Sequence, residues 1–209
     1  MWRKILFAVV VLTFAFAILL LSIFRTAAVR YEVKDNPNSP NTGIPENNGK
    51  VVDYYLPYPG NVLPDSPFWE VKAIRDKIWL SITTNPTRKA ELMLLFADKR
   101  LGSAKELFDK GNINEGITTL SKAEKYLEES LAQEKKNRSI GLDTAEFLIR
   151  LSKASLKHYE VMEEIKAMVA DDVKPVVISF EVYPQKIFEQ SRNSLLETGI
   201  TPPENPFDW

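Results

Sequence analysis

The chain has no cysteine and only one histidine, His158. Without cysteine it cannot form a disulfide, a thiolate metal site, an iron–sulfur cluster, a cysteine nucleophile or the lipidated cysteine of a lipoprotein. A single histidine excludes the H-E-x-x-H zinc pattern and histidine-rich metal sites. Thiol chemistry and metal sites that need several histidines are therefore excluded, and we do not expect His158 to be catalytic.

An excess of charge of one sign is also lacking. Lys and Arg number 27 and Asp and Glu number 28, so the formal net charge is −1. A general nucleic-acid binder would carry a strongly basic stripe. The eight glycines are scattered, and no G-x-S-x-G, Walker or dinucleotide fingerprint occurs. We predict no catalytic, cofactor-binding or metal-binding residue, no cofactor, no nucleic-acid partner and no enzymatic activity.

One long hydrophobic run is present, beginning at Ile5 and ending at Phe24 and broken only by Thr13 and Ser22. A helix needs about 20 apolar residues to cross a bilayer, so the run predicts a membrane anchor within residues 1–28. The small residues at 26–28 would also suit a cleaved secretory signal, but the apolar core of such a signal is usually shorter.

The orientation of this anchor is weakly marked, because cationic residues stand on both sides of the run. The leading tail is only four residues long, and long following domains translocate largely regardless of charge. We therefore expect a cytoplasmic N-terminus, a single-pass anchor in the cell membrane and an extracytoplasmic domain.

A change of composition follows the anchor. Residues 29–50 include a stretch rich in proline, glycine and asparagine, which predicts a disordered linker. Closely spaced prolines in residues 51–67 then favour extended backbone. We expect the apolar side chains of this entry segment to pack along a helical body; they are Tyr54, Tyr55, Leu56, Tyr58 and Leu63.

The entry segment reads L-P-Y-P-G at residues 56–60 and L-P-D-S-P-F-W at residues 63–69. Together with N-P-x-x-K-A-E-L at residues 85–92, it resembles an uncharacterised prokaryotic family, domain of unknown function 5667. The resemblance is good from about residue 51 to 123. It implies several long helices after a hydrophobic N-terminal segment, and no activity.

The first helix of the body is predicted over residues 67–82, with Asp65 or Ser66 as its N-cap. Apolar residues recur in it at steps of three and four, at Val71, Ile74, Ile78 and Ile82, and three aromatic residues (Phe68, Trp69 and Trp79) widen this stripe. Such a stripe is typical of a helix that packs on a core.

Four further helices are predicted. Helix two covers about residues 86–110, capped by Thr83, Thr84 or Asn85 and ended by Gly111; helix three opens at Asn112 or Asn114 and forms a hairpin with it. Helix four covers about residues 142–171, capped by Asp143 or Thr144. Residues 176–183 fit either a strand or a helix that Pro184 kinks; we favour the helix because a single strand has no partner.

The apolar side chains of these helices recur at helical spacing, and we expect them to face the core. The inward positions are expected to be Ala90, Leu94, Ala97, Leu101, Ala104 and Phe108 in helix two; Ile113, Ile117, Leu120, Ala123 or Glu124, Leu127 and Leu131 in helix three; and Ala145, Leu148, Leu151, Leu156, Tyr159, Met162, Ile165 and Val169 in helix four.

Few polar residues suggest a site. We expect His158 at a boundary or on the surface, because it stands between Lys157 and Tyr159. The neighbouring acidic pairs lie at residues 128–129, 163–164 and 171–172. The two side chains of each pair point about 100° apart on a helix, so they should not converge on one substrate atom.

The basic cluster at residues 135–138 suits a helix C-terminus, with lipid head groups as the alternative contact. Asp35, Asn36 and Asn38 lack the glycine and glutamate of a calcium loop, and Asn205-Pro206-Phe207 matches an endocytic tripeptide by chance.

The sequence therefore predicts an all-α fold: an N-terminal transmembrane helix, an extended proline-rich entry, and a bundle of about five long antiparallel helices. The expected domains are the anchor at 1–28, the linker at 29–50, the helical domain at 51–200 and a proline-rich tail at 201–209. The expected partners are the lipid bilayer and an unknown protein, in a binding or scaffolding role in the cell envelope. The alternative is a hydrolase of envelope polymers, whose carboxylates the fold would bring together.

Overall fold

The computed structural model describes residues 2–27 and 51–209 and divides the chain into two units, Met1–Glu46 and Asn47–Trp209. The described part of the first unit is one helix, α1 (Trp2–Ala27). The whole of the predicted linker at 29–50 lies outside the described residues, and with it Asp35, Asn36 and Asn38. Over the residues that are described, no helix combines the length and the hydropathy that crossing a membrane requires.

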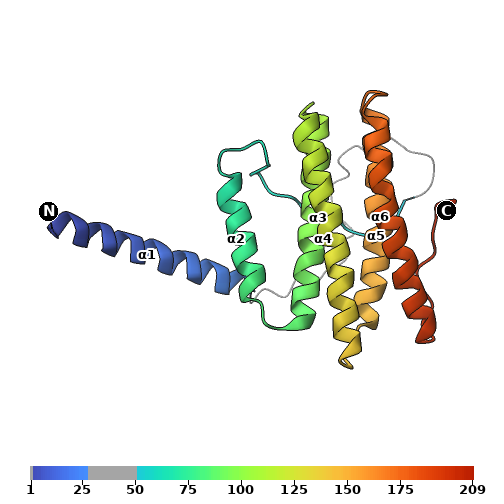
Figure 1. Cartoon of the computed structure of the whole chain (residues 1–209), viewed down its shortest axis with the longest axis horizontal. Coiled ribbons are helices and arrows are strands. Elements are labelled where there is room, and N and C mark those ends of the chain that lie inside the picture. The colour runs from blue at the N-terminus through green and yellow to red at the C-terminus, as the bar shows by residue number, and fades with distance from the viewer. Residues whose placement is uncertain (1, 28–50) are drawn as a thin grey trace, which may run out of the picture. The chain divides into compact units, whose positions relative to one another are not determined.

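The second unit contains five helices (Figure 1). They are α2 (Trp69–Ile82), α3 (Pro86–Asp109), α4 (Ile113–Ser139), α5 (Ala145–Met168) and α6 (Lys174–Glu197). The described residues contain no strand. The prediction of an all-α bundle of about five helices is therefore confirmed.

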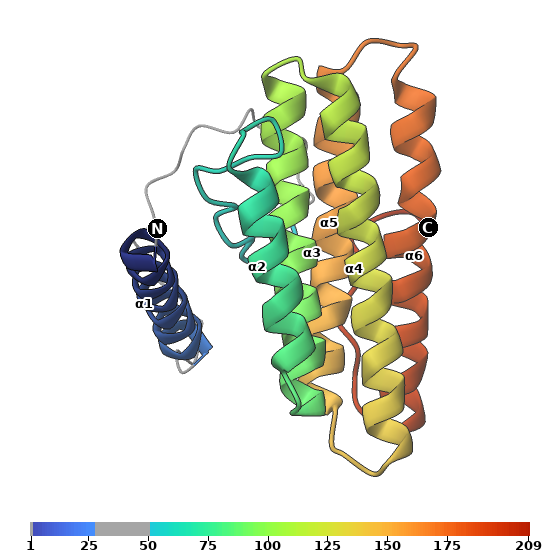
Figure 2. The same ribbon diagram turned by 60° about the vertical axis from the view of Figure 1, so that its left-hand side comes forward.

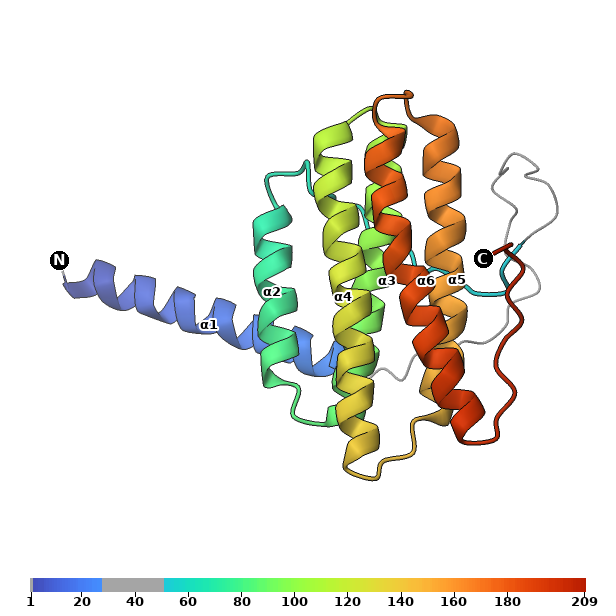
Figure 3. The same ribbon diagram turned by 45° about the vertical axis from the view of Figure 1, so that its right-hand side comes forward.

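Two helical hairpins form the body of the bundle. α3 packs most closely on α4, and α5 packs most closely on α6. Figure 3 shows α4 and α6 side by side, and α2 lies at one edge beside α3 in Figures 1 and 2. This arrangement leaves α2 with one side on the bundle and the other side free.

The residues predicted to begin and end α3 are found at its two ends. The Asn85 side chain accepts a hydrogen bond from the Arg88 backbone N–H, which caps the helix, and Pro86 occupies its first turn. Gly111 adopts a φ of 76°, and the Asn112 N–H donates to the Leu107 carbonyl in the manner of a Schellman motif. Here the sequence predicts both the helix ends and the hairpin.

The predicted start of α2 is wrong. The helix begins at Trp69, and its N-cap, Phe68, makes no side-chain cap hydrogen bond. Ser66 accepts instead from the Phe68 N–H in a turn before the helix, while Asp65 accepts from the Asn112 side chain. The two predicted caps thus serve the turn and the hairpin loop.

Residues 176–183 lie within α6, so the helix prediction is confirmed and the strand alternative is not. Pro184 stands inside the helix. α5 is shorter at both ends than predicted, with Thr144 at the N-cap position and Asp143 accepting from the Ala145 N–H.

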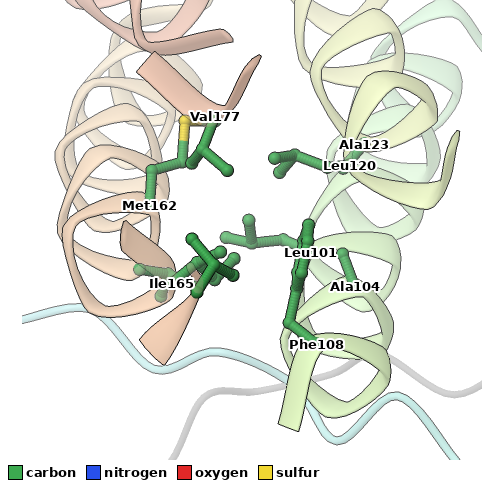
Figure 4. Close-up of a cluster of buried hydrophobic side chains, with 10 residues drawn as sticks. Leu101, Ala104, Phe108, Leu120, Ala123, Met162, Ile165 and Val177 are labelled. Carbon is green, nitrogen blue, oxygen red and sulfur yellow. The ribbon is translucent and has the colours of Figure 1, made fainter. Parts of the chain in front are cut away.

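The largest group of buried apolar side chains fills the space between the two hairpins (Figure 4). Leu101 of α3, Leu120 of α4 and Met162 of α5 are fully buried there. Val177 of α6 closes the group. A second group follows along the bundle, around Leu127, Leu151 and Ile187. The inward positions predicted for the second to fourth helices of the body are largely confirmed. Four of them are only partly buried: Ile113, Ile117, Ala145 and Tyr159.

The entry segment packs along the bundle, although not with every predicted side chain. Tyr54 and Leu56 contact core clusters and Leu63 is buried, as expected. Tyr55 and Tyr58, by contrast, are more than half exposed, so their prediction is wrong. Successive side chains of extended backbone alternate in direction, so neighbours such as Tyr54 and Tyr55 cannot both face the helices.

The tail after α6 folds back on the bundle. Phe207 and Trp209 stack on each other and pack against Tyr159 of α5, and Trp209 also meets Phe188 of α6. Asn205, from the tripeptide at 205–207, accepts from the Phe207 N–H and donates to the Trp209 carbonyl. A cavity of about 470 Å³ lies beneath this tail, lined in part by Phe188, Arg192 and Pro203.

Candidate functional site

His158 lies in the interior of the bundle. Its side chain is fully buried, so the prediction of a boundary or surface position is wrong. The helical spacing carried the correct signal: His158 stands four residues after the buried Ala154 and four before the buried Met162. The flanking Lys157 and Tyr159 misled the interpretation, because neighbours in a helix point about 100° away.

Two buried carboxylates converge on this histidine. Nδ1 of His158 lies 2.7 Å from Oε1 of Glu124 in α4, and Nε2 lies 3.2 Å from Oδ1 of Asp98 in α3. The hydroxyl of Tyr54, from the entry segment, donates to the other Asp98 oxygen at 2.7 Å. Four separate elements thus meet in one polar cluster, which we call the His158 cluster.

Electrostatics make this histidine a cation at neutral pH. Burial opposes its charge, but the attraction of Glu124 and the hydrogen bonds to Asp98 and Glu124 prevail and raise the pKa of His158 to about 9. Both ring nitrogens therefore carry protons, and each donates to one carboxylate. Burial also raises the pKa of Glu124, against the opposing influence of His158, and it raises the pKa of Tyr54 well above its ordinary value, with Asp98 adding to the effect.

The His158 cluster is closed to substrates. Asp98 and Glu124 are at most 3% exposed, and Oε2 of Glu124 has no hydrogen-bond partner. Among the described residues, no group of three or more histidine, cysteine or carboxylate side chains could hold a metal ion. The arrangement fixes the relative position of three helices and the entry segment, because moving either carboxylate away would leave an unpaired charge in the interior.

The acidic pairs predicted not to converge do not converge. Glu163 pairs with Lys166 on its own helix, whereas Glu164 pairs with Lys105 of α3. Glu128 pairs with Lys186. The remaining members lie at the surface or partly exposed; they are Glu129, Asp171 and Asp172.

The basic cluster at 135–138 lies in the last turns of α4, as predicted. Arg138 donates to Glu134 and to Ser194 of α6, and Asn137 donates to the Pro86 carbonyl. Lys135 donates to Gln190. These contacts join α4 to its neighbours, in keeping with the interpretation of a helix end.

The second unusual feature is the apolar stripe of α2, defined as Val71, Ile74, Ile78 and Ile82. These four side chains are 62%, 57%, 41% and 47% exposed, so the prediction that they pack on the core is wrong. Phe68 extends the stripe and is 70% exposed. The stripe therefore faces away from the bundle.

A different face of α2 attaches it to the bundle. Trp79 is buried against Leu92 and Phe96 of α3, with its ring edge-on to Phe96. Asp76 is 5% exposed and accepts from Arg75, while the Arg100 guanidinium lies over the Trp69 ring. Trp69 and Trp79, assigned to the stripe from the sequence, thus belong to the inner face.

The start of α2 is tied down as well. Lys72 donates from Nζ to the carbonyls of Pro59 and Val62 in the entry segment, both at 2.9 Å. Gly60 between them takes a φ of 91°, which favours glycine. The stripe is consequently presented on a helix held at both its beginning and its inner face.

Comparison with known proteins gives one match. No curated protein and no solved structure matches the chain. The family model described as Domain of unknown function matches residues 61–172, which run from the entry segment through α2 to the end of α5 and beyond. The match begins after the L-P-Y-P-G motif and continues past residue 123, where the resemblance in the sequence fades. More than half of the chain is covered, and the chain therefore belongs to the family Domain of unknown function (DUF5667).

Proposed function

We propose that this chain is a membrane-anchored binding module of the cell envelope, and that its working surface is the outward-facing apolar stripe of α2. In this proposal residues 5–24 cross the membrane with the N-terminus in the cytoplasm, and the helical unit lies on the extracytoplasmic side. The partner is a protein that covers the stripe.

The sequence of α1 supports the anchor. Its run from Ile5 to Phe24 has the length of a membrane span and no charged residue. Large apolar side chains of the described part, among them Phe7, Leu12 and Phe14, are mostly exposed. The run continues through residues whose side chains lie outside the described part of the chain.

The single observation that carries the binding role is the exposure of the stripe. Phe68 and the four residues of the stripe are between 41% and 70% exposed, and exposed apolar patches on monomeric proteins are often functional. Leaving this surface in water is unfavourable by about 25 cal/mol per Å² relative to covering it. A partner that covers the stripe would gain that energy.

The geometry favours binding over hydrolysis. A hydrolase of envelope polymers needs two carboxylates that face each other in an open cleft. Asp98 and Glu124 do approach a common group, but that group is the His158 imidazolium in the closed interior. The burial of Asp98 and Glu124 therefore supports a role for these carboxylates in stabilising the fold.

The anchor and its orientation can be tested with single cysteines, since the chain has none. Ser139, at the exposed end of α4, is changed to cysteine and probed in intact cells with a maleimide that cannot cross membranes. We expect labelling from outside, a membrane fraction that resists alkaline extraction, and an intact mass that includes residues 1–28. Protection of Ser139→Cys in intact cells with labelling after lysis would overturn the orientation.

The binding role is tested by purifying the full chain from its native membranes after mild crosslinking. The variant carries Ile74→Gln and Ile78→Gln, which keep the helix and remove the apolar character of the stripe. The control carries Lys122→Gln, an exposed position on α4. We expect a specific crosslinked protein that the control retains and the stripe variant loses; equal recovery with both variants would contradict the proposed function.

A further inference from the structure

The exposed face of α2 spans two heptads, whose positions are labelled a to g, and three of its four a and d positions are apolar. Val71 and Ile78 occupy two successive a positions, and Ile74 and Ser81 occupy the d positions between and after them. All four are exposed. Apolar residues at a and d form the seam along which one helix packs on another, and β-branched residues at a favour two parallel strands.

The charges beside the seam are complementary to a second copy in parallel. Glu70 occupies a g position and Arg75 the e position five residues later; both are exposed. In a parallel pair each g residue lies beside the following e residue of the other helix. Glu70 of each copy therefore meets Arg75 of the other, twice by symmetry.

The second flanking pair is compatible with the same arrangement. Lys77 at g would lie beside Ile82 at e of the other copy, where the lysine stem covers the apolar side chain and its ammonium stays in water. Arg75 already donates from Nε and Nη2 to Asp76. Asp76 lies on the inner face of α2, so Arg75 would reach Glu70 of the other copy with the donors that Asp76 does not use.

An antiparallel pair is disfavoured by the same charges. Its two-fold axis would cross α2 near its middle and bring Arg75 and Lys77 of both copies together. Four cations would then surround the axis, and like charges placed side by side are destabilising.

A lipid surface also fits the stripe less well than a helix does. Helices that lie in the membrane interface place tryptophan, phenylalanine and leucine on their apolar face, and of these types the exposed stripe has Phe68 alone. In α2 both tryptophans face the bundle instead: Trp79 is 9% exposed and Trp69 lies under Arg100. The outer face carries β-branched residues, which suit a packed helical seam.

We propose that the partner of the α2 stripe is a second copy of this chain, and that two α2 helices pair in parallel along Val71, Ile74, Ile78 and Ser81. This inference rests on the proposed function, because it names the occupant of the same surface. The few residues of the stripe are far fewer than the about 20–30 residues a side of a standard stable interface, so the pair is weak in solution. Confinement of both copies to one membrane would raise their effective concentration.

The test uses a single cysteine in the full chain, reconstituted in lipid vesicles or kept in its native membrane. Ser81→Cys places a thiol at a d position, where the two copies face each other. Ser139→Cys is the matched control, because both serines are exposed, helical and bonded to the carbonyl three residues before. Under mild oxidation we expect at least tenfold more disulfide-linked dimer from Ser81→Cys than from Ser139→Cys.

A charge reversal tests the flanking pair. Glu70→Lys, added to Ser81→Cys, replaces two attractions with two repulsions and should weaken the pair about tenfold. The crosslink yield should fall accordingly. An unchanged yield would contradict the parallel register.

Two outcomes would overturn the inference. One is a Ser81→Cys dimer yield no higher than that of Ser139→Cys. The other is crosslinking only when Ser81→Cys is mixed with Val71→Cys, which would indicate an antiparallel pair. The Ile74→Gln, Ile78→Gln variant separates this inference from the proposed function. If Ser81→Cys gives no disulfide-linked dimer but that variant still loses its crosslinked protein, the stripe binds a different protein and the proposed function stands. If Ser81→Cys gives no dimer and the variant keeps its crosslinked protein, the proposed function fails as well.

Discussion

The charge of His158 offers the most quantitative prediction. The substitution is Glu124→Gln, which keeps an oxygen that can accept from Nδ1 of His158 and removes the largest of the influences that raise its pKa. Burial, which opposes the charge, remains. We expect the pKa of His158 to fall well below its value of about 9 in the wild type.

The stability of the wild-type protein should depend on pH in a defined window. The pKa of His158 is raised in the folded state, from 6.5 to about 9. Its contribution is therefore fully present below pH 6.5 and is lost as the pH rises through 9. The rise corresponds to roughly 3 kcal/mol, lost at about 1.4 kcal/mol per pH unit. Glu124→Gln should remove most of this slope.

Two assays check this prediction on the full chain in detergent. With ¹⁵N-labelled histidine, the single histidine gives one set of ring signals, so its titration needs no assignment. Denaturant unfolding at pH 6, 7, 8 and 9 gives the slope of stability. A wild-type midpoint near 6.5, or equal midpoints and slopes in wild type and Glu124→Gln, would refute the assignment of a buried imidazolium.

Three further substitutions have defined outcomes, each measured by denaturant unfolding of the full chain. Tyr54→Phe leaves an oxygen of Asp98 buried without its donor and should cost about 1–3 kcal/mol; a loss below 0.5 kcal/mol would mean that water replaces the hydroxyl. Trp79→Ala opens a cavity beneath α2 and should cost about 3–5 kcal/mol, with faster amide exchange in α2 than in α4; uniform exchange would contradict a local attachment. Asn85→Ala removes the α3 cap and should cost about 1 kcal/mol, while Asn85→Ser should restore most of it; equal stability of both variants would show that the cap contributes little.

Much of the fold follows from the sequence because its signals are local. The Asn85-Pro86 start and the Gly111 end of α3 depend on backbone groups within a few residues, so they can be recognised without tertiary structure. The seams of α3, α4 and α5 are also readable, since those helices have one dominant apolar face. The seam of α4 left Ala123 and Glu124 as alternatives for one inward position, and both are buried.

The site is less predictable, because it depends on which face of a helix meets a neighbour. The period of Val71, Ile74, Ile78 and Ile82 shows that α2 has an apolar stripe but not what the stripe contacts. Trp79 and Asp76, on another face, outweigh it: Trp79 packs on α3, and Asp76 lies 4.0 Å from the Arg100 guanidinium of α3. The His158 cluster joins residues 34 and 60 positions apart, a distance that no local pattern bridges.

The central claim is that the outer face of α2 is a contact surface in the native membrane. Its most direct test is a photo-crosslinking amino acid at Ile74, with the same amino acid at Lys122 of α4 as the control. The account predicts a discrete adduct from position 74, absent from position 122 and lost when Ile78→Gln is added. No adduct from position 74 above the background at position 122 would contradict the account.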